Sequence, residues 1–157
     1  MTAPDERQLD MATDNELVKQ RPTLTWRGAR AAADAAVAKA EADGVNIVVV
    51  VLDRGAHPVV VIRMDGASPL HARAAEAKAR GAVSLGRSTA DFVDYVQKDE
   101  TLYRAILSSG DIFLVGGGDP LVVDGETVGA IGVSGARYVQ DMACATAGEE
   151  AFHKLVS

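Results

Sequence analysis

The sequence predicts an α+β domain in which helices pack on a mostly antiparallel sheet. Two observations support this: β-branched runs occur in pairs joined by short turns, and helical segments separate the pairs without regular strand–helix alternation. The expected order is helix, two strands, helix, a short helical insert, three strands and helix. A chain of 157 residues suits one domain with its own core. We expect that domain at residues 23–157, after a flexible arm at residues 1–22 that has few apolar residues to bury.

The first elements are a helix and a pair of strands. Thr25 is a suitable N-cap for an alanine-rich helix that Gly44 ends. Residues 46–52 form a continuous β-branched run, which is typical of a central strand covered on both faces. Residues 57–64 are predicted to be its hairpin partner.

A second helix follows over residues 69–85, because Pro69 suits a first turn and Gly86 suits a C-terminal stop. Residues 91–107 show a weaker helical pattern, and we interpret them as helix or turn. The short apolar run at residues 112–115 is predicted to be a strand that leads into a glycine cluster.

The last third of the chain contains a hairpin bordered by glycines. Asp124 and Gly125 reach positive φ easily, so they are predicted to join two apolar runs as antiparallel strands. Glycine clusters stand before and after, at residues 116–118 and 129–135, where a helix or a ligand can approach the backbone closely. A final helix is expected at residues 138–155.

Composition argues against several classes of partner. The net charge of −6 provides no cationic field for nucleic acid or an anionic membrane. No apolar run approaches membrane-spanning length, and residues 1–21 lack the basic start and apolar core of a secretory signal. We therefore expect a cytoplasmic protein that binds neither nucleic acid nor membrane. The single cysteine, Cys144, is expected to be a small core residue.

The helix at residues 69–85 carries the side chains best suited to chemistry. His71 and Lys78 lie on one helix face with only small residues between them. Arg63 could bind a carboxylate, His71 could exchange a proton near neutral pH, and Lys78 could hold a negative charge or act as a base or imine former. Structural roles fit the same groups, such as an ion pair of Arg63 with Asp65, and spacing alone favours these roles.

Asp119 lies between glycine and proline at the start of a strand. If it shares a cavity with Arg63 and His71 it can act as an acid or base, and a solvated turn residue is an equal alternative. No spacing fits a zinc site, a nucleophile elbow, a Walker loop or a dinucleotide fingerprint, so no metal is expected. The remaining candidate ligand-binding residues are Asp65, Arg73, Tyr103, Ser109, Gly117, Gly118, Ser134 and Gly135.

Seven short motifs occur in a specific order, at residues 22–25 (PTLT), 51–57 (VLDRGAH), 63–67 (RMDGA), 77–79 (AKA), 116–121 (GGGDPL), 128–135 (VGAIGVSG) and 140–141 (QD). In this order and spacing the chain resembles the GlcG/HbpS family, which also includes the C-terminal domain of PduO-type proteins. The resemblance covers nearly everything from residue 22 to the end.

The resemblance implies a profilin-like, three-layer α/β/α fold with a five-stranded antiparallel sheet, assembled into homo-oligomers of up to eight subunits. Some members of the family bind haem or corrinoid-related ligands or act in haem sensing and degradation, so haem is the cofactor that the resemblance suggests. The family pattern has a small hydroxyl residue near His71, an acid near Arg73 and an apolar residue in place of Asp119. These three departures suggest a specialised ligand or reaction.

Two functions remain open. The first is a cytoplasmic small-ligand-binding protein of the GlcG/HbpS type, in which Arg63 and Lys78 neutralise the carboxylates of haem or a similar anionic ligand, and His71 or a hydroxyl lies near the iron. The alternative is a cofactor-independent acid/base enzyme, an isomerase, hydratase, dehydratase or lyase, acting on a small carboxylate or oxygenated metabolite. Its candidate catalytic residues are His71, Lys78 and Asp119.

Overall fold

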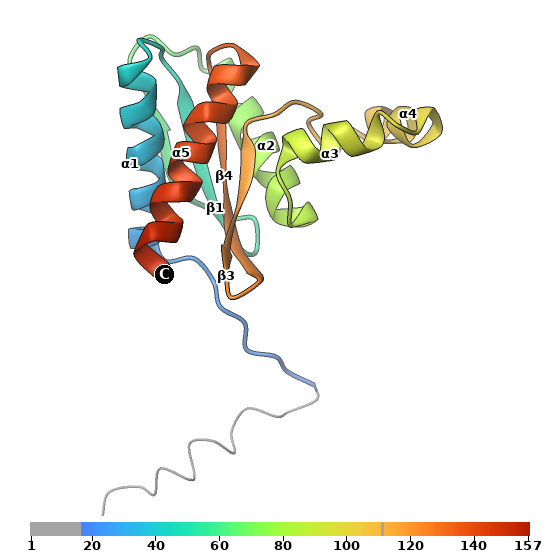
Figure 1. Cartoon of the computed structure of the whole chain (residues 1–157), viewed down its shortest axis with the longest axis horizontal. Helices are drawn as coiled ribbons and strands as arrows, with labels where there is room; N and C mark the ends of the chain where they lie inside the picture. The colour runs from blue at the N-terminus through green and yellow to red at the C-terminus, as the bar shows by residue number, and fades with distance from the viewer. Residues whose placement is uncertain (1–16, 111) are drawn as a thin grey trace, which may run out of the picture.

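The computed structural model describes residues 17–110 and 112–157, and these form three layers (Figure 1). The middle layer is an antiparallel sheet with the strand order β2-β1-β4-β3. Its strands are β1 (Val48–Asp53), β2 (Pro58–Arg63), β3 (Gly118–Val123) and β4 (Glu126–Ser134). The main helices are α1 (Trp26–Ala42) and α5 (Tyr138–Val156) on one face and α2 (Leu70–Leu85) on the other. The expected α+β class is therefore confirmed.

Helix α1 begins where the sequence predicts it. The Thr25 hydroxyl accepts a hydrogen bond from the Gly28 backbone N–H at 3.3 Å and caps the first turn. Gly44, with a φ of 66°, follows the C-cap and stops the helix. Alanines form the buried face and let α1 lie close to α5. They are Ala29, Ala32, Ala33, Ala36 and Ala40.

Strand β1 is the central strand that its β-branched run predicts. It pairs with β2 on one side and with β4 on the other, and both of its faces are buried. Val49 and Val51 pack in the core beneath α1 and α5. Val48, Val50 and Leu52 pack in a second core beneath α2. Because successive strand residues point to opposite faces, β1 contributes to both cores.

Glycines in β3 and β4 let α2 lie directly against the sheet. A Cβ at Gly132 would collide with the backbone of Ala75 and Ala79, and a Cβ at Gly118 would collide with the carbonyl of Lys78. The helix can come this close only because these two positions carry no side chain. The expected close contact between helix and sheet at the glycine clusters is therefore confirmed.

The hairpin between β3 and β4 turns at the predicted dipeptide. Asp124 and Gly125 have φ values of 50° and 78°, and Val123 pairs with Glu126 across the turn. This is the two-residue turn whose twist matches that of the flanking strands.

The expected strand at residues 112–115 is wrong, and within the described residues the sheet has four strands rather than five. The segment bends, and the Val115 N–H donates to the Phe113 carbonyl at 2.8 Å. Both side chains turn toward α2 instead of extending the sheet. A four-residue apolar run is too short for its pattern to distinguish a strand from a buried connection.

The helix or turn expected at residues 91–107 is a pair of short helices, α3 (Thr89–Val96) and α4 (Glu100–Ser109). Asp99 separates them because its carboxylate accepts two backbone N–H groups in the first turn of α4. Figure 1 shows both helices projecting away from the three layers.

The flexible arm expected at residues 1–22 falls mostly on residues 1–16, which lie outside the described residues, so it stays a prediction. Arg21, within the expected arm, pairs with Glu126 at 3.2 Å, and the Leu24 backbone N–H donates to the Val128 carbonyl at 2.9 Å. The start of α1 is thereby tied to β4.

We expect Gly132→Ala to destabilise the protein. A Cβ at this position has no room beside the Ala75 carbonyl, so α2 or β4 must shift, at a cost of roughly 1–3 kcal/mol or more. Gly81→Ala in α2 is the matched control, because its Cβ would make ordinary contacts at 3.4 and 3.5 Å and loss of a helix glycine gains up to about 1 kcal/mol. Urea denaturation measures both changes. Equal stability of the two variants would contradict the close packing of α2 on β4.

Candidate functional site

A cavity of about 610 Å³ lies between α2, the end of β4 and the start of α5, and we call it the α2 cavity. Its apolar wall consists of Leu70, Ala74, Ala77, Phe113, Val115, Ala136 and Tyr138. Its polar groups come from His71, Arg73, Lys78, Ser134 and Asp141. A mainly apolar cavity of this size with a few polar groups is typical of a small-molecule site. Four of the predicted site residues, His71, Arg73, Lys78 and Ser134, therefore share one cavity.

His71 lies in the first turn of α2 and faces the last residue of β4. Its Nδ1 is 3.2 Å from the Ser134 hydroxyl oxygen, within hydrogen-bond distance. This contact orients the imidazole ring and leaves Nε2 for another partner. Arg73, two residues further along α2, is exposed and lines the same cavity.

Lys78 is the buried cation of the α2 cavity, with only 2% of the residue exposed. Its Nζ donates to the Val133 carbonyl at 2.8 Å and to Asp141 Oδ2 at 2.9 Å. Asp141 Oδ1 accepts the Ala136 N–H at 3.0 Å. Burial lowers the pKa of Lys78, while the hydrogen bond and charge of Asp141 act in the opposite direction. The ion pair holds α2 to the start of α5.

The sequence analysis did not identify Asp141 as a site residue, although an acid on the apolar face of α5 is a recognisable signal. The buried residues of α5 recur at helical spacing, at Asp141, Cys144, Ala145, Gly148 and Phe152. An acid within an apolar stripe needs a buried partner, and Lys78, on the buried face of α2, is that partner. Cys144 is buried, as expected.

Arg63 lies on the same face of the sheet as the α2 cavity but does not line it. Arg63 pairs with Val48, and Val48 pairs with Ser134. Arg63 is therefore two strands, roughly 10 Å, from Ser134. Its guanidinium donates to the Ala67 carbonyl at 3.0 Å. Arg63 thus does not share the cavity as the sequence suggested, and its role as a carboxylate anchor stays a prediction.

Asp119 points to the opposite face of the sheet. Its ladder partner Ile131 packs in the core beneath α1 and α5, so the cavity that Asp119 might share with His71 does not exist. It lines a separate cavity of about 470 Å³. The Thr146 hydroxyl donates to Asp119 Oδ2 at 3.2 Å. Burial, reinforced by the charge of Glu149, raises the pKa of Asp119 to about 6.

Among the described residues, six further predicted ligand-binding residues do not line the α2 cavity: Asp65, Tyr103, Ser109, Gly117, Gly118 and Gly135. The two on α4 project with that helix away from the layers. Gly117 makes room for the buried ammonium, because a Cβ there would lie 3.2 Å from Lys78 Nζ. The Gly118 N–H donates to the Thr89 hydroxyl at 3.0 Å.

Within residues 17–110 and 112–157, no group of three His, Cys, Asp or Glu side chains is placed to hold a metal ion. No helix in the same ranges is long and apolar enough to cross a membrane. The described α2 cavity offers an imidazole, a guanidinium and a buried ion pair against an apolar wall.

Known proteins resemble this chain along most of its length. The family model described as haem degrading protein HbpS-like matches residues 24–150. GlcG of Escherichia coli strain K12 is 31% identical over 117 residues, which are 74% of this chain and 85% of GlcG. A double mutant of HbpS from Streptomyces reticuli has a TM-score of 0.77 at 32% identity, covering 96% of this chain and 97% of its own. The PduOC:haem complex has a TM-score of 0.76 at 31% identity, with 82% and 94% covered.

We expect Lys78→Met to lower the free energy of unfolding by about 3–5 kcal/mol, because it leaves Asp141 buried without its counter-ion. Adding Asp141→Asn removes the unpaired charge and should restore much of the loss. Arg80→Met, on the exposed side of the same helix, is the control and should change stability by less than about 1 kcal/mol. Urea denaturation of the single and double variants gives the coupling energy, and simple additivity would contradict a direct pair.

We expect Asp119→Asn to flatten the pH dependence of stability. A carboxyl whose folded-state pKa is raised contributes stability that is present below its unfolded-state pKa and is lost as pH rises through the folded value of about 6. Between about pH 5 and pH 8 the unmodified protein should lose roughly 1–2 kcal/mol that the variant keeps. Denaturation across this range measures the difference. Asp124→Asn, in the exposed hairpin turn, is the control, and a matching effect there would rule out Asp119 as the cause.

Proposed function

This chain belongs to the family of HbpS-like haem degrading proteins, and we propose that it is a small-ligand-binding protein whose α2 cavity takes haem or a similar flat, anionic ligand. The observation that carries the proposal is the cavity itself, a mainly apolar space of about 610 Å³ with an imidazole and a guanidinium in its wall. The PduOC:haem complex, at 31% identity, supports this choice of ligand.

The residues of the α2 cavity fit the parts of haem. The apolar wall would cover the porphyrin, with Leu70, Phe113 and Tyr138 exposed at its rim. His71 would face the iron through Nε2, because Nδ1 already lies against Ser134. When bound, haem would supply a redox-active iron.

Arg73 is the cation placed to neutralise the carboxylates of such a ligand. Its side chain is exposed at the cavity, and a guanidinium binds carboxylates in a bidentate manner. Lys78 is less suited to this role, because Asp141 and the Val133 carbonyl already bind its ammonium. We therefore assign Lys78 to the support of the cavity and Arg73 to contact with the ligand.

The buried Lys78 favours a second candidate function, acid/base catalysis on a small carboxylate. Burial lowers its pKa, which brings an amine closer to use as a base or nucleophile. His71 in the same cavity would move the proton. In this case Lys78→Met would abolish turnover even where folding is restored by Asp141→Asn, whereas a binding protein carrying both changes would keep its ligand.

Titration of the purified protein with haemin tests the proposed function. We expect a shifted Soret band that saturates at one haem per chain. His71→Ala should change the band position, because the iron loses a nitrogen ligand. Arg73→Gln should keep the band position and weaken binding, because only the charge partner of the carboxylates is lost.

Matched controls exist for both variants. His57→Ala removes a histidine that is exposed at the turn between β1 and β2. Arg80→Gln removes a cation from α2 that pairs with Glu76 away from the cavity. Neither should alter the titration. An unshifted Soret band, or the same band in His71→Ala as in His57→Ala, would reject haem ligation by His71.

A further inference from the structure

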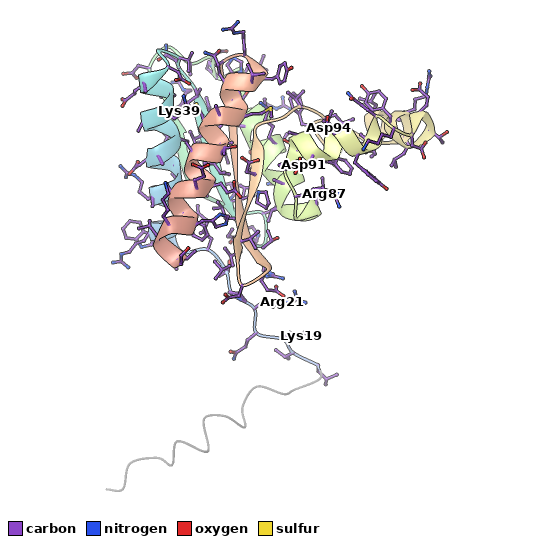
Figure 2. All side chains as sticks on the ribbon, viewed as in Figure 1. Lys19, Arg21, Lys39, Arg87, Asp91 and Asp94 are labelled. Carbon is purple, nitrogen blue, oxygen red and sulfur yellow. The ribbon has the colours of Figure 1, made fainter. Side chains whose placement is uncertain are left out.

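A second cavity, of about 470 Å³, lies at the edge of the sheet beside β3, and we call it the β3-edge cavity. β3 is the outer strand of the sheet, next to β4 alone. The cavity is bounded by the loop between α2 and α3, by β3 and by α5. Figure 2 shows Arg87 just before α3 and Asp91 in its first turn. Both residues line the β3-edge cavity. This site is independent of the haem proposal, because it shares no residue with the α2 cavity.

Asp119 forms the buried part of the β3-edge cavity, with 8% of the residue exposed. Thr146 donates to Oδ2, while no described residue donates to Oδ1. Since every fully buried side-chain oxygen in the described residues has a partner, Oδ1 must be open to the cavity. A carboxylate oxygen in this position requires a donor from a ligand or from solvent.

The cavity carries an excess of negative charge. Asp119 comes from β3, Glu149 from α5 and Asp91 from α3, and Arg87 is the single cation in the wall. Three carboxylates and one guanidinium therefore line the wall, and the nearest further titratable group is His153, whose Nδ1 lies 3.7 Å from Glu149 Oε1. The Arg87 guanidinium also lies over the ring of Tyr95, 5.6 Å from its centroid.

The arrangement of these carboxylates suits an organic cation better than a metal ion. Among the described residues, no three acidic side chains converge on one point where they could ligate an ion. The carboxylates instead stand on different walls of a cavity. An alkyl diamine carries N–H donors at two separated ends, so each end can meet a different carboxylate.

We propose that the β3-edge cavity binds a small organic diammonium ion, with one ammonium group at Asp119 and Glu149 and the other toward Asp91. Thr146 keeps Asp119 oriented, because its hydroxyl holds Oδ2 and leaves Oδ1 for the ligand. Two positive charges suit a wall in which carboxylates outnumber cations by three to one.

Binding of a diammonium ion to this cavity should depend on whether Asp119 is protonated. Burial and the neighbouring charges of Glu149 and Asp91 raise the pKa of Asp119 to about 6. Arg87 is the one cation in the cavity wall, Thr146 contributes a hydroxyl, and His153 faces Glu149 from the next turn of α5. A bound ammonium favours the ionised carboxylate, so binding must weaken when Asp119 is protonated. At about pH 5 only some 10% of a group with this pKa is ionised, which predicts a loss of affinity of about tenfold.

Isothermal titration calorimetry of the full chain with putrescine, a short alkyl diamine, tests the proposal. The titrations are made at about pH 7.5 and about pH 5, in about 0.15 M salt so that attraction to exposed surface charges is screened. We expect saturable binding at the higher pH, about tenfold weaker binding at the lower pH and at least tenfold weaker binding in Asp119→Asn. Asp124→Asn, in the exposed hairpin turn, should bind like the unmodified chain.

A second variant and a second ligand test the same proposal independently of Asp119→Asn. Glu149→Gln should weaken putrescine binding whether or not Asp119→Asn folds, since Glu149 stands at the partly exposed side of the cavity. Butylamine, with one ammonium group, should bind more weakly than putrescine. Absence of saturable binding, affinity that is unchanged in both Asp119→Asn and Glu149→Gln, or displacement of putrescine by equimolar Ca²⁺ would overturn the proposal.

Discussion

The ion pair between Lys78 and Asp141 connects the two helix layers of this protein. Lys78 belongs to α2 and Asp141 to α5, and these helices cover opposite faces of the sheet. They can meet beside the end of β4 because Gly117 leaves space next to the ammonium. A buried pair stabilises a fold only when its other polar atoms are also bonded. Here the ammonium also binds the Val133 carbonyl, and the second carboxylate oxygen accepts a backbone N–H. The pair therefore fixes the position of the α2 cavity, whose wall includes residues of both helices.

Most of the fold could be predicted because its signals act on neighbouring residues. The Thr25 cap, the Gly86 stop and the turn at residues 124–125 each determine local backbone geometry without help from the rest of the chain. The β-branched run of β1 indicated burial on both faces, which is found. The strand expected at residues 112–115 failed because pairing depends on tertiary structure. Phe113 and Val115 line the α2 cavity, while Leu114 lies against α3, and a short apolar run gives no sign of these contacts.

The site could be predicted only in part, for a related reason. Helical spacing placed His71 and Lys78 on one face correctly, since both belong to one helix. Asp141, the partner of Lys78, lies 63 residues further along the chain, and a local sequence pattern cannot predict such a contact. The direction of Asp119 depends in the same way on a distant contact. Gly118 faces α2, where a side chain would collide with Lys78, so the next residue of the strand faces the opposite side.

Helix α5 lines both cavities, so its orientation determines the shape of each one. Tyr138 and Asp141 face the α2 cavity, while Thr146 and Glu149 face the β3-edge cavity. Rotation of α5 to suit one ligand would reshape the other site and would also withdraw Asp141 from Lys78. Breaking a buried pair costs about 3–5 kcal/mol, whereas a ligand can shift a conformational equilibrium only by its difference in affinity for the two states. The pair of Lys78 and Asp141 thereby holds α5 in the one orientation that shapes both cavities.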